Sequence, residues 1–220
     1  MNAVIIDTET TGLVEPAIVE VAYVRLASLA PLDVHPLDAF IQRFNPGKRI
    51  DLGAMATHHI TDEDVADEPP AASFALPDDV DTIIGHNVDF DWRAIGSPSV
   101  RRICTLALAR RCWPKLDSHS LTALLYHVDR PAARHHAPHA HSAIADVHML
   151  GLVLPHLLEL VGTPLTIDGL WGISKAARVP AFMPYGKHKG VPMAEVPRDY
   201  KRWLLNQPDV DEYLRKALAA

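Results

Sequence analysis

Residues 3–13, with the sequence AVIIDTETTGL, constrain the fold of this chain more than any other stretch. The opening AVII is a short apolar run rich in β-branched residues, which is typical of a central strand buried on both faces. Because successive side chains of a strand alternate between its faces, Asp7 and Glu9 point to one side and Thr8 to the other. The sequence therefore predicts two carboxylates that share a small volume at the end of a central strand.

Two carboxylates this close raise one another's pKa or require a cation between them. A hard divalent ion with oxygen ligands, Mg²⁺ or Mn²⁺, is the economical explanation of the pair. The alternative is that the acids only mark the place where a strand meets solvent, with Thr10, Thr11 and Gly12 as an ordinary turn. The pair alone does not decide between a metal site and an exposed strand end.

Composition narrows the class of protein. With 220 residues, of which 48% are hydrophobic and 22% charged, the chain can form one large domain with a small appendage. A formal net charge of −6 argues against broad coating of nucleic acid, although it allows an enzyme that grips a few nucleotides. Cys104 and Cys112 have the spacing of neither a zinc motif nor a disulfide framework. We see no leader and no apolar stretch of about 18 residues, so we expect a cytoplasmic protein without membrane contact.

The order of the apolar segments predicts a mixed α/β fold. We predict strands over 3–6, 17–29, 39–44, 82–84 and 102–105, and a long helix over 142–161. Strands first, and then strands alternating with helices, favour a mixed five-stranded sheet flanked by helices. We expect this domain to span residues 1–162, followed by a connector with one short helix over 163–179.

A small basic module is predicted over residues 180–220. Between Pro180 and Trp203 five Lys or Arg stand against two acids, a local charge of +3 on an acidic protein. Its lysines could contact phosphate, and Tyr185, Tyr200 and the tryptophan could stack on bases. A packed mini-core with a solvated basic face explains the same residues.

The segment HNVDFD, residues 86–91, carries two more acids. Asn87 is a suitable N-cap, which would place Asp89 and Asp91 in the first turn of a helix just beyond a strand end. Compensation of the helix dipole explains acids at that position as well as a functional role does.

The segment HSAIAD, residues 141–146, carries the last acid. If Ser142 caps the following helix, Asp146 projects from its first turn and His141 lies in the preceding loop. This arrangement suits a metal-binding Asp and a mobile general base. Alternatively, His141 is one more histidine of a polar loop, as we expect for His135, His136 and His139. Zinc binding by the His-rich tract is a further alternative, but the tract lacks four-ligand spacing with cysteines.

Together, DTETTGL at Asp7, HNVDFD ending at Asp91 and HSAIAD from His141 to Asp146 resemble the three motifs of the DEDDh 3′-to-5′ exonucleases. This superfamily includes polymerase proofreading exonucleases, ribonuclease T and oligoribonuclease. HHIT, which contains His58, resembles an element between the first two motifs. The segments MATHHIT, ICTLALARRCWP and YGKHKG through YKRWLL extend the resemblance over nearly the whole chain. The resemblance implies a ribonuclease H-like fold.

The resemblance also implies roles for particular residues. It makes His141 the general base and gives two divalent cations, Mg²⁺ or Mn²⁺, to four acids: Asp7, Glu9, Asp91 and Asp146. Candidates for binding the terminal nucleotide are Thr8, Thr10, Leu13, His58 and Asn87. A core leucine is the alternative for Leu13.

The implied reaction is hydrolysis that releases 5′-mononucleotides from the 3′ ends of single-stranded or duplex DNA, in DNA repair or recombination. An exoribonuclease of the same fold is an alternative, because the catalytic motifs contact phosphate and metal rather than the 2′-hydroxyl. A non-catalytic subunit that binds nucleic-acid ends or a polymerase is a third.

Overall fold

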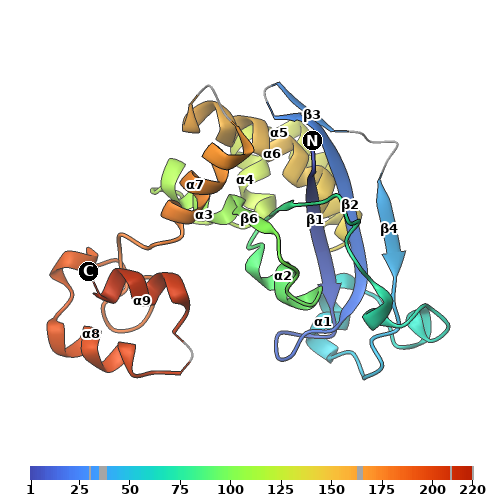
Figure 1. The fold of residues 1–220 in the computed structure, drawn as a ribbon, viewed down its shortest axis with the longest axis horizontal. Helices are drawn as coiled ribbons and strands as arrows, with labels where there is room; N and C mark the ends of the chain where they lie inside the picture. The colour runs from blue at the N-terminus through green and yellow to red at the C-terminus, as the bar shows by residue number, and fades with distance from the viewer. Residues whose placement is uncertain (30, 35–38, 163–165, 209, 220) are drawn as a thin grey trace.

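A mixed sheet lies at the centre of the larger part of the molecule (Figure 1). The computed structural model describes residues 1–29, 31–34, 39–162, 166–208 and 210–219, and these residues form six strands. The strands are β1 Ala3–Thr10, β2 Ile18–Leu29, β3 Leu32–Val34, β4 Phe40–Arg43, β5 Thr82–Gly85 and β6 Arg101–Cys104. All five predicted strands are present, and β3 is an addition that pairs with the end of β2.

The sheet has the order β3-β2-β1-β5-β6, and β4 also pairs with β2. The pairings of β2 with β1, β3 and β4 are antiparallel. The pairings of β1 with β5 and of β5 with β6 are parallel. This mixed sheet confirms the predicted α/β fold, with β1 at its centre as the AVII run indicates.

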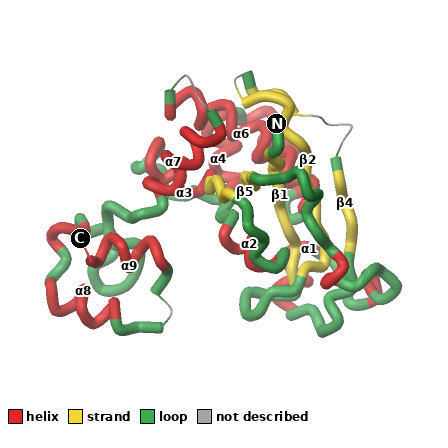
Figure 2. Tube along the Cα trace, in the orientation of Figure 1, coloured by secondary structure: helices red, strands yellow, loops and turns green. Residues whose placement is uncertain are grey.

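Helices cover both faces of the sheet (Figure 2). Those of the larger part are α1 Leu52–His58, α2 Asp89–Ala94, α3 Thr105–Cys112, α4 Leu121–Val128, α5 Arg130–His136, α6 Ala143–Val161 and α7 Ile167–Ala177. Ala3 and Ile5 of β1 pack in the core that contains α3, α4 and α6. Val4 and Ile6 point to the opposite face, where they pack with Val88 beside α2. Alternation along β1 thus gives each face its own apolar core.

The long helix α6 confirms the helix predicted over 142–161. Its buried positions include Val147, Leu150 and Leu157, which pack in the same core as β1 and β2. By length and composition alone this helix could cross a membrane, so the expectation of no such apolar stretch was wrong. Its packing against the sheet accounts for its apolar character, since a core helix needs a wide apolar face.

The helix α7 lies within the predicted connector and packs against β6 and α3. Leu170 is fully buried in the core of the sheet, and the Ser174 hydroxyl accepts a hydrogen bond of 2.8 Å from the backbone N–H of Cys104. The first residues of the predicted connector, 163–165, lie outside the described residues. The described part of the connector therefore belongs structurally to the sheet.

The region after Pro180 has an apolar core of its own. It contains α8 Arg198–Leu205 and α9 Glu212–Ala219, which contact each other. Its buried core consists of Met183, Met193, Val196, Leu204, Val210, Leu214, Ala217 and Leu218. We call residues 180–219 the C-terminal module; in Figure 1 it forms the part of the ribbon set apart at the left.

Candidate active site

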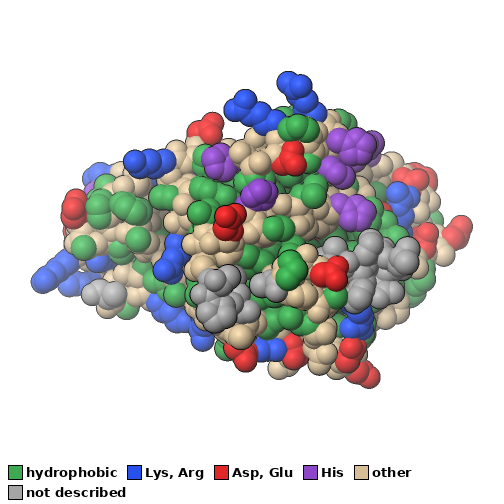
Figure 3. Space-filling view, turned by 90° about the horizontal axis from the view of Figure 1, so that it is seen from above, with side chains coloured by type: hydrophobic (Ala, Val, Ile, Leu, Met, Phe, Trp, Pro, Cys, Tyr) green, Lys and Arg blue, Asp and Glu red, His purple; other side chains and the backbone are tan. Residues whose placement is uncertain are grey.

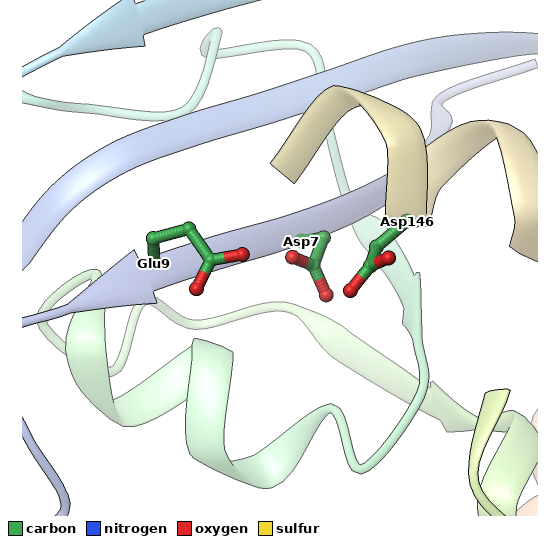
Figure 4. Close-up of side chains that lie close together, drawn as sticks. All are labelled: Asp7, Glu9 and Asp146. Atoms are coloured by element: carbon green, nitrogen blue, oxygen red, sulfur yellow. The ribbon is translucent and has the colours of Figure 1, made fainter. Parts of the chain in front are cut away.

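Asp7, Glu9 and Asp146 form a carboxylate cluster at the end of β1 (Figure 4). One ligand oxygen of each lies within 4.8 Å of the others. The alternation of β1 turns both strand residues toward α6, and Asp146 projects from the first turn of that helix. Three carboxylates from two elements thus converge, as the strand pattern and the helix start predict.

The proximity and burial of the three carboxyl groups raise their pKa values. Burial, followed by the charges of Asp91 and Asp146, raises the pKa of Asp7 well above its usual value. Burial raises the pKa of Glu9 to about 8, with further contributions from neighbouring carboxylates. Burial also raises the pKa of Asp146. A divalent cation would supply the opposite charge that these oxygens lack, so the donor set fits a hard metal ion.

Asp91 reaches the site from α2, on the other face of β1. Its carboxylate oxygen Oδ1 accepts hydrogen bonds from the Thr8 backbone N–H at 3.1 Å and from the Thr8 hydroxyl at 2.7 Å. Burial raises the pKa of Asp91 to about 7, although the Thr8 hydrogen bonds lower it. Asp91 is not a member of the 4.8 Å cluster among the described residues, but its charge acts on Asp7. The Thr8 hydroxyl is therefore used to hold Asp91, which leaves its proton unavailable to a nucleotide.

His141 lies immediately before α6, in a left-handed backbone conformation with φ of 66°. Its backbone N–H is 3.4 Å from Oδ1 of Asp146, and its side chain is exposed. Ser142 occupies the N-cap position, as predicted. The histidine therefore stands beside the cluster on the loop side, outside the helix that carries the aspartate.

Glu20 is a site residue that the sequence reasoning missed. It is only 4% exposed and lies opposite Glu9 in the β1–β2 register. Its oxygen Oε2 accepts a hydrogen bond of 3.1 Å from the Ala143 backbone N–H, and Oε1 is 3.3 Å from Nε of Arg43. Glu20 thus fixes the start of α6 and the position of Asp146. The sequence signal that could have identified Glu20 is that it is the one charged residue in the otherwise apolar segment IVEVAYV.

Leu13 and His58, two of the predicted nucleotide contacts, have opposite exposure. Leu13 is 85% exposed, so the alternative of a core leucine was wrong. His58 is buried: its Nδ1 accepts a hydrogen bond from Ile60 N–H at 3.0 Å, so its Nε2–H donates to the Thr10 carbonyl at 3.2 Å. Burial lowers the pKa of His58. Because both ring nitrogens act inside the protein, His58 braces the loop after β1 instead of contacting a nucleotide through them.

The predicted N-cap role of Asn87 was wrong. The helix α2 begins at Asp89 with Val88 as its N-cap, and Asn87 has a left-handed φ of 68°. Asn tolerates this conformation better than most residues, and the Asn87 carbonyl accepts a hydrogen bond of 2.9 Å from Phe90 N–H. Its side chain is exposed at the start of the helix that carries Asp91.

The Thr10 hydroxyl donates a 3.1 Å hydrogen bond to the Gly12 carbonyl, which closes the turn after β1. Thr10 is 6% exposed. Because its hydroxyl is bonded within the turn and the residue is buried, Thr10 has little surface left for the predicted contact with a nucleotide.

A mixed sheet flanked by helices, with carboxylates gathered at the end of its central strand, defines a nuclease of the ribonuclease H-like class. The family model described as exonuclease, of the RNase T type, matches residues 4–154. Exodeoxyribonuclease 10 of Escherichia coli strain K12 is 31% identical over 215 residues, which cover 93% of this chain and 91% of that protein. This chain belongs to the exonuclease family, and the DEDDh resemblance and the fold are confirmed.

Solved structures agree with this assignment. A structure described as exonuclease X in complex with 5′-overhanging duplex DNA matches with a TM-score of 0.62 and 28% identity, covering 78% of this chain and 99% of that chain. Escherichia coli exonuclease I in complex with a dT13 oligonucleotide matches with a TM-score of 0.56 and 20% identity, covering 70% of this chain and 40% of that chain. The second likeness shows the fold alone.

Proposed function

We propose that this protein is a 3′-to-5′ exodeoxyribonuclease that uses two divalent cations, Mg²⁺ or Mn²⁺, and releases 5′-mononucleotides from DNA 3′ ends. The observation that carries the proposal is the convergence of Asp7, Glu9 and Asp146, with Asp91 held beside them. The names of two similar proteins, an exodeoxyribonuclease and an exonuclease in complex with duplex DNA, favour DNA as the substrate. A cytoplasmic role in DNA repair or recombination is part of this proposal.

The carboxylates would hold the cations, and two other side chains keep them in place. Divalent cations bound there lower the pKa of a water molecule and stabilise the leaving 3′-oxygen. Thr8 fixes the orientation of Asp91 through two hydrogen bonds. Glu20 fixes the first turn of α6, and with it Asp146. Held in this way, the acids need little reorganisation when a phosphodiester enters.

His141 is the proposed general base. An imidazole can take a proton from the attacking water near neutral pH. Its exposed position on the loop before α6 lets the ring approach a phosphate at the cluster, and the backbone contact with Asp146 keeps it near.

Leu13 is proposed to pack against the terminal base. An apolar side chain that is 85% exposed, on the turn directly after the catalytic strand, gains stability when a base covers it. Asn87 is exposed at the start of α2 and is the proposed polar contact on the opposite side of the site.

The test uses 5′-labelled single-stranded DNA, duplex DNA and RNA with Mg²⁺ or EDTA. We expect a Mg²⁺-dependent ladder that shortens from the 3′ end on DNA. Asp7→Ala should abolish it, and His141→Ala should lower the rate by roughly 10²- to 10⁴-fold. His135→Ala, which removes another exposed histidine, is the matched control and should keep the wild-type rate.

Each alternative has its own outcome in this experiment. Equal or faster shortening of RNA would favour an exoribonuclease. Binding of DNA ends without metal-dependent hydrolysis would favour the non-catalytic subunit, and wild-type rates in both site variants would contradict the assignment of the site.

A further inference from the structure

The C-terminal module carries an aromatic pocket outside the carboxylate cluster. The rings of His188 and Tyr200 are 4.6 Å apart at 71°, and those of Tyr200 and Trp203 are 5.4 Å apart at 36°. A pocket of about 320 Å³ adjoins them, lined by Lys187, His188, Pro197, Asp199, Tyr200 and Trp203. Trp203 is 55% exposed, whereas its neighbour Leu204 is buried in the core of the module. Core packing therefore accounts for Leu204 and leaves the exposed indole unexplained.

A glycine turn lies beside Tyr200 and leads into Lys187 and His188, which line this pocket. Gly186 has a φ of 75°, and its carbonyl accepts a hydrogen bond of 3.1 Å from Lys189 N–H. A Cβ atom at Gly186 would lie 2.5 Å from the Tyr200 hydroxyl, so only glycine allows the turn to pack this closely. This approach places Lys187 and His188 at the rim of the aromatic pocket.

The charge of the module is opposite to that of the rest of the chain. Residues 180–220 contain seven Lys or Arg and five Asp or Glu, within a protein whose net charge is −6. Figure 3 shows Lys and Arg side chains spread over the left end of the molecule, where Figure 1 places the module. A basic surface beside exposed aromatic faces complements phosphate and unpaired bases.

We propose that this pocket binds an unpaired nucleobase of single-stranded DNA, stacked on Trp203, while Lys187 contacts the adjacent phosphate. A paired base would not serve, because its faces are covered in the duplex. Asp199 also lines the pocket; it can accept a hydrogen bond from a base amino group and directs the phosphate toward the lysine. The choice of DNA rests on the proposed function, but the existence of the pocket does not.

A clamp of polar groups holds the module in a defined position. Arg178 is 5% exposed at its side chain and donates to Asp89 at 3.3 Å and to the Arg102 carbonyl at 3.0 Å. The same guanidinium donates to the hydroxyl of Tyr213 in α9. Arg102 also lies 3.6 Å from Glu212 of α9. Because Asp89 belongs to α2, the pocket and the carboxylate cluster are parts of one connected framework.

The test is fluorescence anisotropy of labelled dT20 with the full-length protein in EDTA, where no hydrolysis occurs, at several salt concentrations. Trp203→Ala should weaken binding by roughly 5- to 150-fold, the loss expected for one stacked base. Trp203→Phe keeps an aromatic face and should remain close to wild type. Tyr126→Ala, which removes an exposed aromatic residue of α4, is the control and should bind normally.

A second variant tests the phosphate contact independently of the indole. Lys187→Ala should reduce the magnitude of the slope of log affinity against log salt by about one. Lys115 is an exposed lysine in the larger part of the molecule, and Lys115→Ala should leave the slope unchanged. Wild-type affinity in both Trp203→Ala and Lys187→Ala would overturn the proposal. So would an equal loss of affinity for blunt duplex DNA, because stacking requires an unpaired base.

A short substrate separates this proposal from the proposed function. Trp203→Ala should hydrolyse the p-nitrophenyl ester of thymidine 5′-phosphate at the wild-type rate with Mg²⁺, because this ester offers no second nucleotide to the module. A loss on the ester would instead place Trp203 at the catalytic cluster and overturn the proposal. If the wild-type protein hydrolyses neither ester nor DNA, the proposed function fails, and the dT20 measurement still decides about the pocket.

Discussion

Replacing Glu9 by Gln should stabilise the metal-free protein at neutral pH and weaken its stabilisation by metal. Glu9 is 8% exposed and lies near other acids, and burial raises the pKa of its carboxyl group from 4.5 to about 8. The folded protein therefore binds this proton more tightly than the unfolded chain does. The stability that this proton contributes is fully present below pH 4.5 and is lost progressively as the pH rises toward 8.

The magnitude follows from the width of that pH window. One pKa unit corresponds to about 1.4 kcal/mol, so the free energy of unfolding at pH 7 is lowered by about 3 kcal/mol through this one group. Gln carries no charge and avoids this loss. For a chain of this size, 1 kcal/mol changes the melting temperature by about 2 to 4 °C, so the substitution should raise it by roughly 6 to 12 °C.

The assay is thermal unfolding followed by circular dichroism in EDTA. The difference between Glu9→Gln and wild type should grow from about 1 kcal/mol at pH 5 to about 4 kcal/mol at pH 8. Mg²⁺ at 100 times its Kd should stabilise the wild type by about 2.7 kcal/mol and the variant by less. Glu159→Gln, at an exposed position of α6, is the matched control and should follow the wild type. A variant that melts below the wild type at pH 7 in EDTA, or a difference independent of pH, would refute this reasoning.

Three further substitutions test Thr8 and Glu20, which hold the acids, and His58, which braces the loop after β1. Thr8→Val removes a hydrogen bond to a charged group, worth about 1.5 to 3 kcal/mol, and should weaken Mg²⁺ binding in calorimetry roughly tenfold or more, whereas Thr8→Ser should not. Glu20→Ala should lower kcat by removing the acceptor of the Ala143 N–H at the start of α6, with the far-ultraviolet spectrum unchanged; an unaltered kcat would count against this role. Burial lowers the pKa of His58, so the folded state binds its proton less tightly and stability falls as the pH drops below 6.5. His58→Gln should flatten this acid limb in urea unfolding between pH 7 and 5, and an unchanged limb would contradict it.

Local patterns were sufficient to predict the elements that position the site. The AVII run predicted β1, and the apolar period over 142–161 predicted α6 to within one residue at its start. Both signals are strong because burial alone decides them: one strand is covered on both faces, and one helix has a wide apolar stripe. The convergence of Asp7, Glu9 and Asp146 follows directly from these two elements.

Polar and Ala-rich segments were harder to predict. The tract expected as a His-rich loop contains α5, whose last turn holds His135 and His136, so the loop assignment of these two residues was wrong. Its start is fixed by Asp129, whose side chain accepts a hydrogen bond from Ala132 N–H. An N-cap at Asp129 could have been predicted from the sequence, but the tract has too few regularly spaced apolar residues to indicate a helix.

Residues whose partners lie far along the chain could not be assigned from the sequence. Glu20 bonds to Ala143, 123 positions away, and Thr8 bonds to Asp91, 83 positions away. Periodicity reports which face a side chain occupies, and it does not report what stands opposite. For that reason the sequence predicted that Asp7, Glu9 and Asp146 converge, whereas it did not reveal that Glu20 and Thr8 hold the neighbouring elements.

The two acids of α2 have different partners, one at the carboxylate cluster and one in the contact with the C-terminal module. At about 100° per residue, Asp89 and Asp91 point to nearly opposite sides of one short helix. Asp91 meets Thr8 at the cluster, while Asp89 meets Arg178 in the clamp that reaches α9. The side chains of this pair are 5% and 23% exposed, so loss of either partner leaves a partly buried charge without its counter-ion and weakens the contact between the two parts. Asp89, which is not one of the four acids of the family motif, thus links the helix that carries Asp91 to the C-terminal module.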